Sequence, residues 1–590
     1  MKRMLQKTRL SEQLTLLSSI ALLFIIGIDF GYPDVYWNQL LVDAFYAGYG
    51  ILFSYRMYDM SRSRHRSDHY HHKGRILVTI LVIFFTATAL LNVLRFVADH
   101  PLELNIVAAV SGFLLAITDV SERIFQIQQQ RVHPALAFVL SFFILIMLGT
   151  SLLLLPLSTP DGISAIDALF TATSAVCVTG LIVVDTGSDF TRFGQIIILL
   201  LIQFGGLGML TFTNLFGLFF RGSGSLQNRL ILKNMINASR VGNTFRRLTQ
   251  IMVFTVTVEA LGTAIIYFSI GPELPATQDR FFFSVFHAIS AFCNAGFSTL
   301  SNSLYEPFIR HKYFIHLVIA TLIILGGIGF GVVIDYYRYL IKWIRYRIHV
   351  WQRTTRKSKA LSPPDISLNT VLIVRTALFL WLGGTVLFFL LEQKHMLDNA
   401  SSFGQWVTSI FAAVTPRTAG FNTVPTAELQ TPTLVLLLFL MWVGASPGST
   451  GGGIKTTTLA LSFLNVAQQI MGTRRIRVGW KEIPTEAPRR AMSILTLSLA
   501  AIGTSSFLLL FTDGQLGLKA IFFESVSAFS TVGLSLGITD ALSTAGKIII
   551  TITMFVGRVG FLTLLTGIIR QLVRYRPQPG RYPEEEIFIN

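Results

Sequence analysis

The sequence predicts an all-α polytopic membrane protein. In it, four pseudo-symmetric repeats of span, pore helix and span surround one central pore, preceded by about four extra N-terminal transmembrane helices. Three observations carry this prediction. Of 590 residues, 52% are hydrophobic and only 13% are charged, whereas soluble proteins carry about 25% charged residues. Apolar runs long enough to cross a bilayer recur along the chain, and one glycine-containing segment recurs four times.

The predicted spans are the apolar runs that can cross a hydrocarbon core about 30 Å thick, which takes roughly 20 helical residues. Short polar or basic segments separate them, and no soluble domain of appreciable size fits between them. The runs lie near 14 to 30, 37 to 55, 76 to 97, 103 to 119, 134 to 157, 194 to 220, 248 to 271, 313 to 337, 368 to 392, 432 to 463, 491 to 512 and 546 to 569.

The positive charge follows the spans. The net charge is +17, and most of the 48 Lys and Arg residues occupy every second loop. Because cytoplasmic loops are enriched in Lys and Arg, both termini are expected in the cytoplasm. The positive charge thus reflects the orientation of the chain in the membrane, and no nucleic-acid partner is expected. These basic segments are 1 to 10, 56 to 75, 121 to 133, 221 to 247, 338 to 363, 464 to 490 and 570 to 590.

The recurring segment places a glycine at the same point of four units. It reads Ala-Val-Cys-Val-Thr-Gly-Leu at 175 to 181, Ala-Phe-Cys-Asn-Ala-Gly-Phe at 291 to 297, Thr-Pro-Arg-Thr-Ala-Gly-Phe at 415 to 421 and Ala-Phe-Ser-Thr-Val-Gly-Leu at 528 to 534. The apolar stretch before each glycine is too short to span the bilayer. It must therefore re-enter from the outside, which is tolerated only where the backbone is buried or lines a water-filled path.

Phenylalanine marks the register of these short stretches. Phe170, Phe286 and Phe523 stand ten residues before their glycines, whereas the third copy has Ile410 there and Phe411 one place later. The third copy is therefore the divergent one.

Four converging turns can offer rings of carbonyl oxygens to a dehydrated monovalent cation in place of its water shell. Glycine permits the backbone angles that point carbonyls inward. For any single copy, a glycine that merely ends a helix is the simpler interpretation, and it is the fourfold recurrence that favours a filter. The predicted ion-binding residues are Val178, Thr179, Gly180, Asn294, Ala295, Gly296, Thr418, Ala419, Gly420, Thr531, Val532 and Gly533.

The four segments, together with the run Gly-Ala-Ser-Pro-Gly-Ser-Thr-Gly-Gly-Gly-Ile-Lys-Thr-Thr-Thr at 444 to 458, resemble the Trk/Ktr/HKT superfamily of cation transporters over about residues 134 to 573. The resemblance implies K⁺ bound at the filter residues and an intramembrane gating loop at 444 to 458. It also implies an arginine in the last span, which Arg558 matches. It further implies a homodimer and a separate cytoplasmic nucleotide-binding subunit of the RCK type. The expected location is a plasma membrane, the inner membrane of a bacterial cell.

The loop can also be interpreted from its composition. Five glycines and a proline do not hold a regular helix at membrane depth, so the freed backbone groups must face protein or water. A phosphate-binding loop is disfavoured because Gly and Lys-Thr are not adjacent. The predicted gating residues are Gly448, Ser449, Thr450, Gly451, Gly452, Gly453, Lys455 and Arg558.

Lys455 and Arg558 are intramembrane cations, which are functional candidates by default. Two roles stay open for them: repelling a cation below the filter, or pairing with helix carbonyls at the break. Glu259 and Glu524 are candidate partners. Cys177 and Cys293 are expected to be buried packing residues rather than a redox pair.

The leading functional hypothesis is channel-like K⁺ uptake, with no catalytic site and no cofactor in this chain; Na⁺ is a second candidate ion. The alternatives are a Na⁺- or H⁺-coupled symporter with alternating access, disfavoured because carriers usually show inverted repeats, and an intramembrane enzyme. Whether histidines between His65 and His72 bind a metal stays open. The expected regions are an extension at 1 to 130, pore repeats at 134 to 220, 248 to 345, 368 to 463 and 489 to 573, and a tail at 574 to 590.

Overall fold

A computed structural model describes residues 134–208, 244–352 and 366–572 and parts of the first 116 residues, apart from short gaps. In that N-terminal part it describes most of 14–26, all of 36–62 and 79–91, and a few positions between 108 and 116. The gaps within the larger ranges are 272–273, 275–277, 399, 474 and 480. The expected histidine cluster, positions 221 to 243 of the basic loop 221 to 247, and the tail 574 to 590 lie outside the described residues, whereas 244 to 247 begin helix α10.

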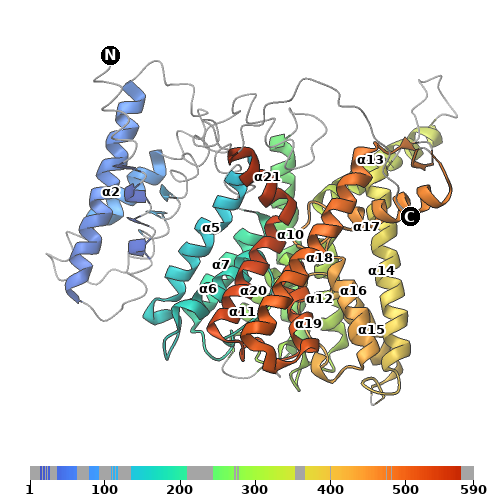
Figure 1. Cartoon of the computed structure of the whole chain (residues 1–590). Helices are drawn as coiled ribbons and strands as arrows, with labels where there is room; N and C mark the ends of the chain where they lie inside the picture. Colours follow the sequence, from blue (N-terminus) through green and yellow to red (C-terminus); the bar gives the residue numbers. More distant parts are fainter. Residues whose placement is uncertain are drawn as a thin grey trace.

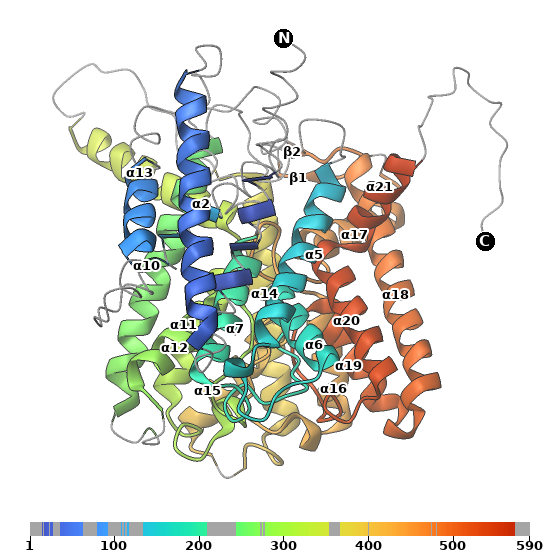
Figure 2. The same cartoon turned by 90° about the vertical axis from the view of Figure 1, so that its left-hand side faces the viewer.

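The N-terminal part forms a small apolar core of its own. Helix α2 (Tyr36–Arg62) stands at the left edge of the molecule in Figure 1 and in front of the other helices in Figure 2. Its Tyr46 packs on Phe85 of the apolar helix Thr79–Leu91, with ring centroids 6.1 Å apart. Two of the four expected N-terminal spans therefore correspond to described helices.

The rest of the chain repeats one order of elements four times: a long helix, a short helix, a turn, and a further helix that is broken or ends at a glycine. The first unit contains α5 (Pro134–Leu153), α6 (Ala165–Cys177) and α7 (Arg192–Leu207). The second contains α10 (Thr244–Ile270), α11 (Arg280–Cys293), α12 (Tyr313–Gly327) and α13 (Phe330–Gln352).

The third unit contains α14 (Leu368–Glu392), α15 (Ser402–Val414), α16 (Thr431–Trp442) and α17 (Thr456–Ile470). The fourth contains α18 (Glu486–Asp513), α19 (Leu518–Ser530), α20 (Thr544–Val559) and α21 (Phe561–Leu572). Short elements in the connections are the 3₁₀ turns η2 (Pro156–Ser158), η5 (Ser303–Tyr305), η6 (Thr426–Glu428) and η7 (Gly514–Leu516), and the antiparallel strands β1 (Arg477–Val478) and β2 (Lys481–Glu482).

Side-chain oxygens fix where several of these helices begin, because they accept hydrogen bonds from otherwise unpaired N–H groups of the first turn. Ser164 caps α6, Asp279 caps α11 and Ser401 caps α15. Thr191 and Ser543 do the same for α7 and α20. The short helices α6, α11 and α15 thus begin at polar caps, whereas α19 begins after Gly517, which provides no side-chain cap. All four lead into the glycine turns.

Each short helix packs within its own unit and also against a helix of the preceding unit. Helix α11 contacts α7, α15 contacts α12 and α19 contacts α16, while α6 of the first unit contacts α20 of the last. The units therefore follow one another in a closed order. In both views the short helices lie toward one end of the bundle, and α13, α17 and α21 lie toward the other (Figures 1 and 2).

Among the described residues, three helices are long and apolar enough to cross a membrane: Thr249–Ile270, Leu368–Glu392 and Glu486–Leu516. The expected single span 313 to 337 is instead a pair, Tyr313–Gly327 and Phe330–Arg347, bent by 93°. The expected span 546 to 569 is likewise divided, between α20 and α21. Gly329 and Gly560 stand at the two breaks with φ of 93° and 85°, in the left-handed region that residues with a Cβ resist.

The expected break in 432 to 463 lies between Trp442 and Thr456. Residues 456 to 458, the last three of the predicted loop 444 to 458, form the first turn of α17 instead. Lys455 is the residue at which the helical backbone resumes. The irregular loop is therefore 443 to 455, three residues shorter at its C-terminal end than expected.

Candidate functional site

The four turns share an unusual backbone. The residue two places before each glycine adopts the left-handed conformation although it is not glycine, with φ of 56° at Val178, 61° at Asn294, 75° at Thr418 and 51° at Thr531. The glycines themselves have φ between 73° and 93°. A left-handed residue with a Cβ costs about 1–2 kcal/mol. Strain repeated at four matching positions persists only where the surroundings enforce it, as at functional sites.

The turns meet in a ring. In each turn the glycine packs directly on the carbonyl oxygen of the residue that precedes the glycine in the next turn. A Cβ built on Gly296 would lie 2.6 Å from the carbonyl oxygen of Ala419, closer than real Cβ contacts. The other pairs are Gly420 with Val532, Gly533 with Thr179 and Gly180 with Ala295. Because the last turn contacts the first, the ring is closed and has no room for a side chain at the glycines.

A hydroxyl near the end of each short helix holds the adjoining turn. Ser174 Oγ donates to the carbonyl oxygen of Leu181 at 2.7 Å and accepts from the N–H of Gly180 at 3.1 Å. Sequence reasoning missed these hydroxyls, although a serine or threonine four residues after each marker phenylalanine was visible. The equivalent bonds are Ser290 to Phe297 at 2.7 Å, Thr415 to Phe421 at 2.7 Å, and the Gly533 N–H to Ser527 at 3.1 Å.

The divergence of the third copy lies in the turn rather than in the helix. Phe411 is buried like Phe170, and each stands four residues before its hydroxyl, Thr415 or Ser174. From the hydroxyl to the glycine, however, the third copy has five residues where the others have six. The one-residue offset at Ile410 therefore reflects a shorter third turn.

The loop 443 to 455 docks against the break between α12 and α13. The Ser446 N–H donates to the Gly327 carbonyl at 3.0 Å, and the Phe330 N–H donates to the Gly448 carbonyl at 3.1 Å. Thr450 Oγ1 donates to the carbonyl of Phe292, the next-to-last residue of α11, at 3.3 Å. The third unit's loop is thus bound by the second unit.

The same loop lies directly against the ring of turns. The Gly452 N–H donates to Thr531 Oγ1 at 3.0 Å. A Cβ on Gly451 would overlap Thr418 Oγ1, and that hydroxyl donates to the side-chain amide oxygen of Asn294 at 3.2 Å. The side chains two places before three of the glycines therefore face the loop or one another. The loop packs beneath the turns with glycine at its closest points.

Both intramembrane cations bind carbonyl oxygens of this region. Lys455 Nζ donates to Gly451 at 2.6 Å and to Gly452 at 3.2 Å. Arg558 Nη1 donates to the Thr450 carbonyl, and Nη2 donates to the Gly205 carbonyl at 2.5 Å. Arg558 thereby joins the third unit's loop and the first unit's helix to the fourth unit.

Neither candidate carboxylate pairs with these cations among the described residues. Glu259 Oε2 accepts from Gln203 Nε2 at 3.2 Å, and Glu524 Oε1 accepts from Thr539 Oγ1 at 2.5 Å. Glu524 and His287 directly follow their marker phenylalanines in α19 and α11. Each binds the irregular segment that follows its glycine, His287 through a 2.9 Å contact to Ser298. Sequence reasoning missed His287.

Cys177 and Cys293 are buried and unbonded to each other, as expected of packing residues. A Cβ on Gly206 would lie 2.7 Å from Cys293 Sγ, so the thiol fills the space opposite a glycine of α7. Within the described part of the chain, no group of three His, Cys, Asp or Glu side chains is suited to hold a metal ion.

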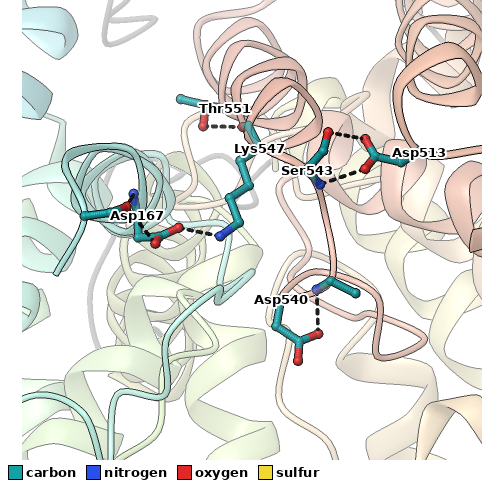
Figure 3. A network of polar contacts seen from close by, with 8 residues as sticks. Asp167, Asp513, Asp540, Ser543, Lys547 and Thr551 are labelled. Atoms are coloured by element: carbon teal, nitrogen blue, oxygen red, sulfur yellow. Dashed lines mark hydrogen bonds and ion pairs between the residues drawn. The ribbon is translucent and has the colours of Figure 1, made fainter.

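Two ion pairs join neighbouring units near the ends of the short helices. Lys547 of α20 binds Asp167 of α6 at 2.6 Å, and both side chains are less than a fifth exposed (Figure 3). Figure 3 also shows Ser543, which begins α20, held by Asp513 at the end of α18. Arg192 of α7 binds Asp279 of α11 at 2.9 Å, but these side chains are 45% and 59% exposed.

We expect Lys547→Met to destabilise the protein by about 1–3 kcal/mol, between the values for exposed and for fully buried pairs, because it leaves the Asp167 carboxylate without its cation. Arg192→Met is the matched control and should cost less, since its pair is largely solvated. Thermal unfolding in detergent measures both. Equal losses for the two variants would contradict the difference in burial.

Known proteins resemble this chain over most of its length. The TrkH family model, described as a cation transport protein, matches residues 104–573. The chain is 34% identical over 451 residues to the Ktr system potassium uptake protein B of Vibrio alginolyticus, covering 76% of this chain and 93% of that protein. It is 34% identical over 467 residues to the potassium/sodium uptake protein NtpJ of Enterococcus hirae, covering 78% and 98%.

The fold has a solved counterpart. The crystal structure of the potassium transporter TrkH from Vibrio parahaemolyticus superimposes with a TM-score of 0.60 at 18% sequence identity, covering 84% of this chain and 97% of that chain. This likeness concerns the fold. The helical, multi-pass architecture expected from the sequence is confirmed by it.

Proposed function

Because this chain belongs to the TrkH family of cation transport proteins, we propose that it takes up K⁺ across the plasma membrane by a channel-like mechanism. The relatives named above are potassium uptake proteins, one of them for potassium and sodium. The single observation that carries the mechanism is the closed ring of four strained turns. The four units are then pseudo-symmetric repeats around one central pore.

In this proposal the carbonyl oxygens of the turns replace the hydration shell of the ion. The positive φ of the glycines and of the residues two places earlier alternates with ordinary backbone between them, which lets successive carbonyls face the same side. Ions would bind at the carbonyls of Val178, Thr179, Gly180, Asn294, Ala295, Gly296, Thr418, Ala419, Gly420, Thr531, Val532 and Gly533.

We further propose that the loop beneath the ring is the gate, with Gly448 to Gly453, Lys455 and Arg558 holding it closed. Its contacts with Thr418 and Thr531 support this role, because the loop occupies the space directly below the turns. Irregular backbone at membrane depth is tolerated where protein buries it or where it lines a cavity.

The regulatory expectations are also part of the proposal. A separate cytoplasmic RCK-type nucleotide-binding subunit would dock on the basic segments 221 to 247, 338 to 363 and 464 to 490. The chain would act as a homodimer with both termini in the cytoplasm, and 1 to 130 would be a peripheral membrane extension. Cross-linking of the purified protein in membranes and co-purification with its regulator test these points.

Ion flux into liposomes tests the function. We expect the purified protein to carry K⁺ and Rb⁺ down their gradients and to discriminate against Na⁺ and Li⁺, without requiring a gradient of a second ion. K⁺ flux that depends strictly on a Na⁺ or H⁺ gradient would favour the symporter instead. Equal conduction of Na⁺ and K⁺ would refute the filter assignment.

Deleting 448 to 453 is expected to raise basal K⁺ flux at least severalfold, because the deletion removes the obstruction beneath the ring while leaving the turns in place. The K⁺ to Na⁺ ratio should change little. Flux and thermal stability are measured on the same preparation. Unchanged flux in a deletion variant that retains its unfolding temperature would contradict the gating role.

A further inference from the structure

Arg417 is a buried cation in the third turn with no counterpart in the other three. It stands three residues before Gly420 and is 4% exposed. The matching positions hold small neutral side chains, which are Cys177, Cys293 and Ser530. An intramembrane arginine is expensive to bury and by default marks a functional site.

The contacts of Arg417 do not explain its presence as a stabilising residue. Nη2 donates to the Gly444 carbonyl at 3.1 Å, and the guanidinium lies 5.1 Å from the ring centre of Trp381 on α14. Nε and Nη1 have no hydrogen-bond partner among the described residues. Buried donors that stay unpaired cost stability. Arg417 therefore leaves two of its nitrogens unpaired, while the third binds the Gly444 carbonyl.

The Gly444 carbonyl lies at the N-terminal end of the loop. Helix α16 ends at Trp442, and Gly444 is the second residue beyond it. A Cβ on Gly444 would lie 3.1 Å from the Cα of Gly453, so the two ends of the loop meet there. The next residue of the turn, Thr418, contacts Gly451 in the middle of the loop. The third turn thus contacts the loop both at its N-terminal end, Gly444, and near its centre, Gly451.

Arginine and loop occur together in one unit. In the second unit the matching Cys293 packs on Gly206 of α7. In the third unit the turn is one residue shorter, and the loop, rather than a continuing helix, lies within reach of the side chain. Arg417 is therefore in direct contact with the loop 443 to 455.

We propose that Arg417 is a positioning residue that couples the third turn to the loop, so that the loop leaves its position beneath the ring only when the Arg417–Gly444 hydrogen bond breaks. This inference rests on the proposed function. It goes further by assigning to a residue of the third turn, in addition to Lys455 and Arg558, part of the contacts that hold the loop in place.

The test combines Arg417→Gln with the deletion of 448 to 453. In the full chain, Arg417→Gln should raise basal ⁸⁶Rb⁺ flux on the order of tenfold, which corresponds to about 1.4 kcal/mol in the closed-to-open equilibrium. In the deletion background Arg417→Gln should raise ⁸⁶Rb⁺ flux no further, because the loop segment that the hydrogen bond keeps beneath the ring is absent. Arg417→Lys, which keeps the charge but loses the planar group, should give an intermediate rise.

A merely structural role predicts other results. If Arg417 only supported the turn, Arg417→Gln would lower the K⁺ to Na⁺ ratio, and by the same factor in both backgrounds; that result would overturn the proposal. Should Arg417→Gln fail to fold, Trp381→Leu removes the stacking partner and leaves the hydrogen bond. It should raise flux in the same direction but less, and an unchanged flux would count against the coupling.

A readout independent of transport separates this proposal from the function it rests on. Ser449→Cys places a thiol in the loop, and the rate of its alkylation reports how often the loop leaves its site. We expect a severalfold faster rate when Arg417→Gln is added. An unchanged rate refutes the coupling even if K⁺ flux is observed, whereas a faster rate without any K⁺ flux upholds the coupling and refutes the proposed function.

Discussion

Gly180→Ser is expected to abolish most of the preference for K⁺ over Na⁺. A Cβ at this position would overlap the carbonyl oxygen of Ala295 in the second turn, and the glycine has a φ of 88°. The second turn must move away, so that one carbonyl of the proposed ring no longer points at the ion. We expect the K⁺ to Na⁺ flux ratio to fall on the order of tenfold or more, which is about 1.4 kcal/mol.

Substitutions at two other glycines distinguish the effect of steric overlap from the effect of backbone strain. Gly537 has a φ of 83° with nothing within 4 Å of the place that a Cβ would occupy, and Gly383 in α14 has open space and an ordinary helical backbone. Gly537→Ala should cost stability without changing selectivity, and Gly383→Ala should stabilise α14 by up to about 1 kcal/mol without changing selectivity. Flux ratios in K⁺ and Na⁺ gradients measure all three. A Gly180→Ser protein that stays selective would show that the ring tolerates displacement of this carbonyl.

The architecture could be predicted because it depends on patterns that a single sequence displays. Apolar runs of membrane length and a glycine recurring beside Phe170, Phe286 and Phe523 need no knowledge of tertiary contacts. The shorter third turn also left a visible trace in the offset of Phe411. The roles given to the turn residues stay predictions, although the ring contacts at Gly296 and Gly420 support them.

The breaks at Gly329 and Gly560 were not predicted, because one glycine in an apolar run costs a helix only about 1 kcal/mol and does not by itself end it. What ends α12 is the loop of another unit: a Cβ on Gly329 would lie 2.7 Å from the Pro447 carbonyl. The partners of Arg417 were equally invisible, since Gly444 and Trp381 lie far from it along the chain. Contacts between units decide these features, and periodicity does not report them.

Arg558→Gln is expected to raise K⁺ flux by one to two orders of magnitude while leaving the K⁺ to Na⁺ ratio nearly unchanged. Two effects act in the same direction. The side chain donates to the carbonyls of Thr450 and Gly205, and hydrogen bonds from a charged group contribute about 1.5–3 kcal/mol each. A cation about 5 Å from a permeating ion would also repel it by about 3 kcal/mol at an effective dielectric constant near 20.

Arg558→Lys separates these two effects, because it keeps the charge and loses the planar fork that reaches two carbonyls at once. If the tether to the loop dominates, Arg558→Lys should conduct nearly as well as Arg558→Gln. If repulsion dominates, it should conduct like the unmodified protein. The contacts of Arg558 favour the tether, since both of its terminal nitrogens are engaged by carbonyls of other units. Arg375→Gln, at an exposed position on α14, is the control, and a similar rise in flux there would show that loss of any span arginine loosens the protein.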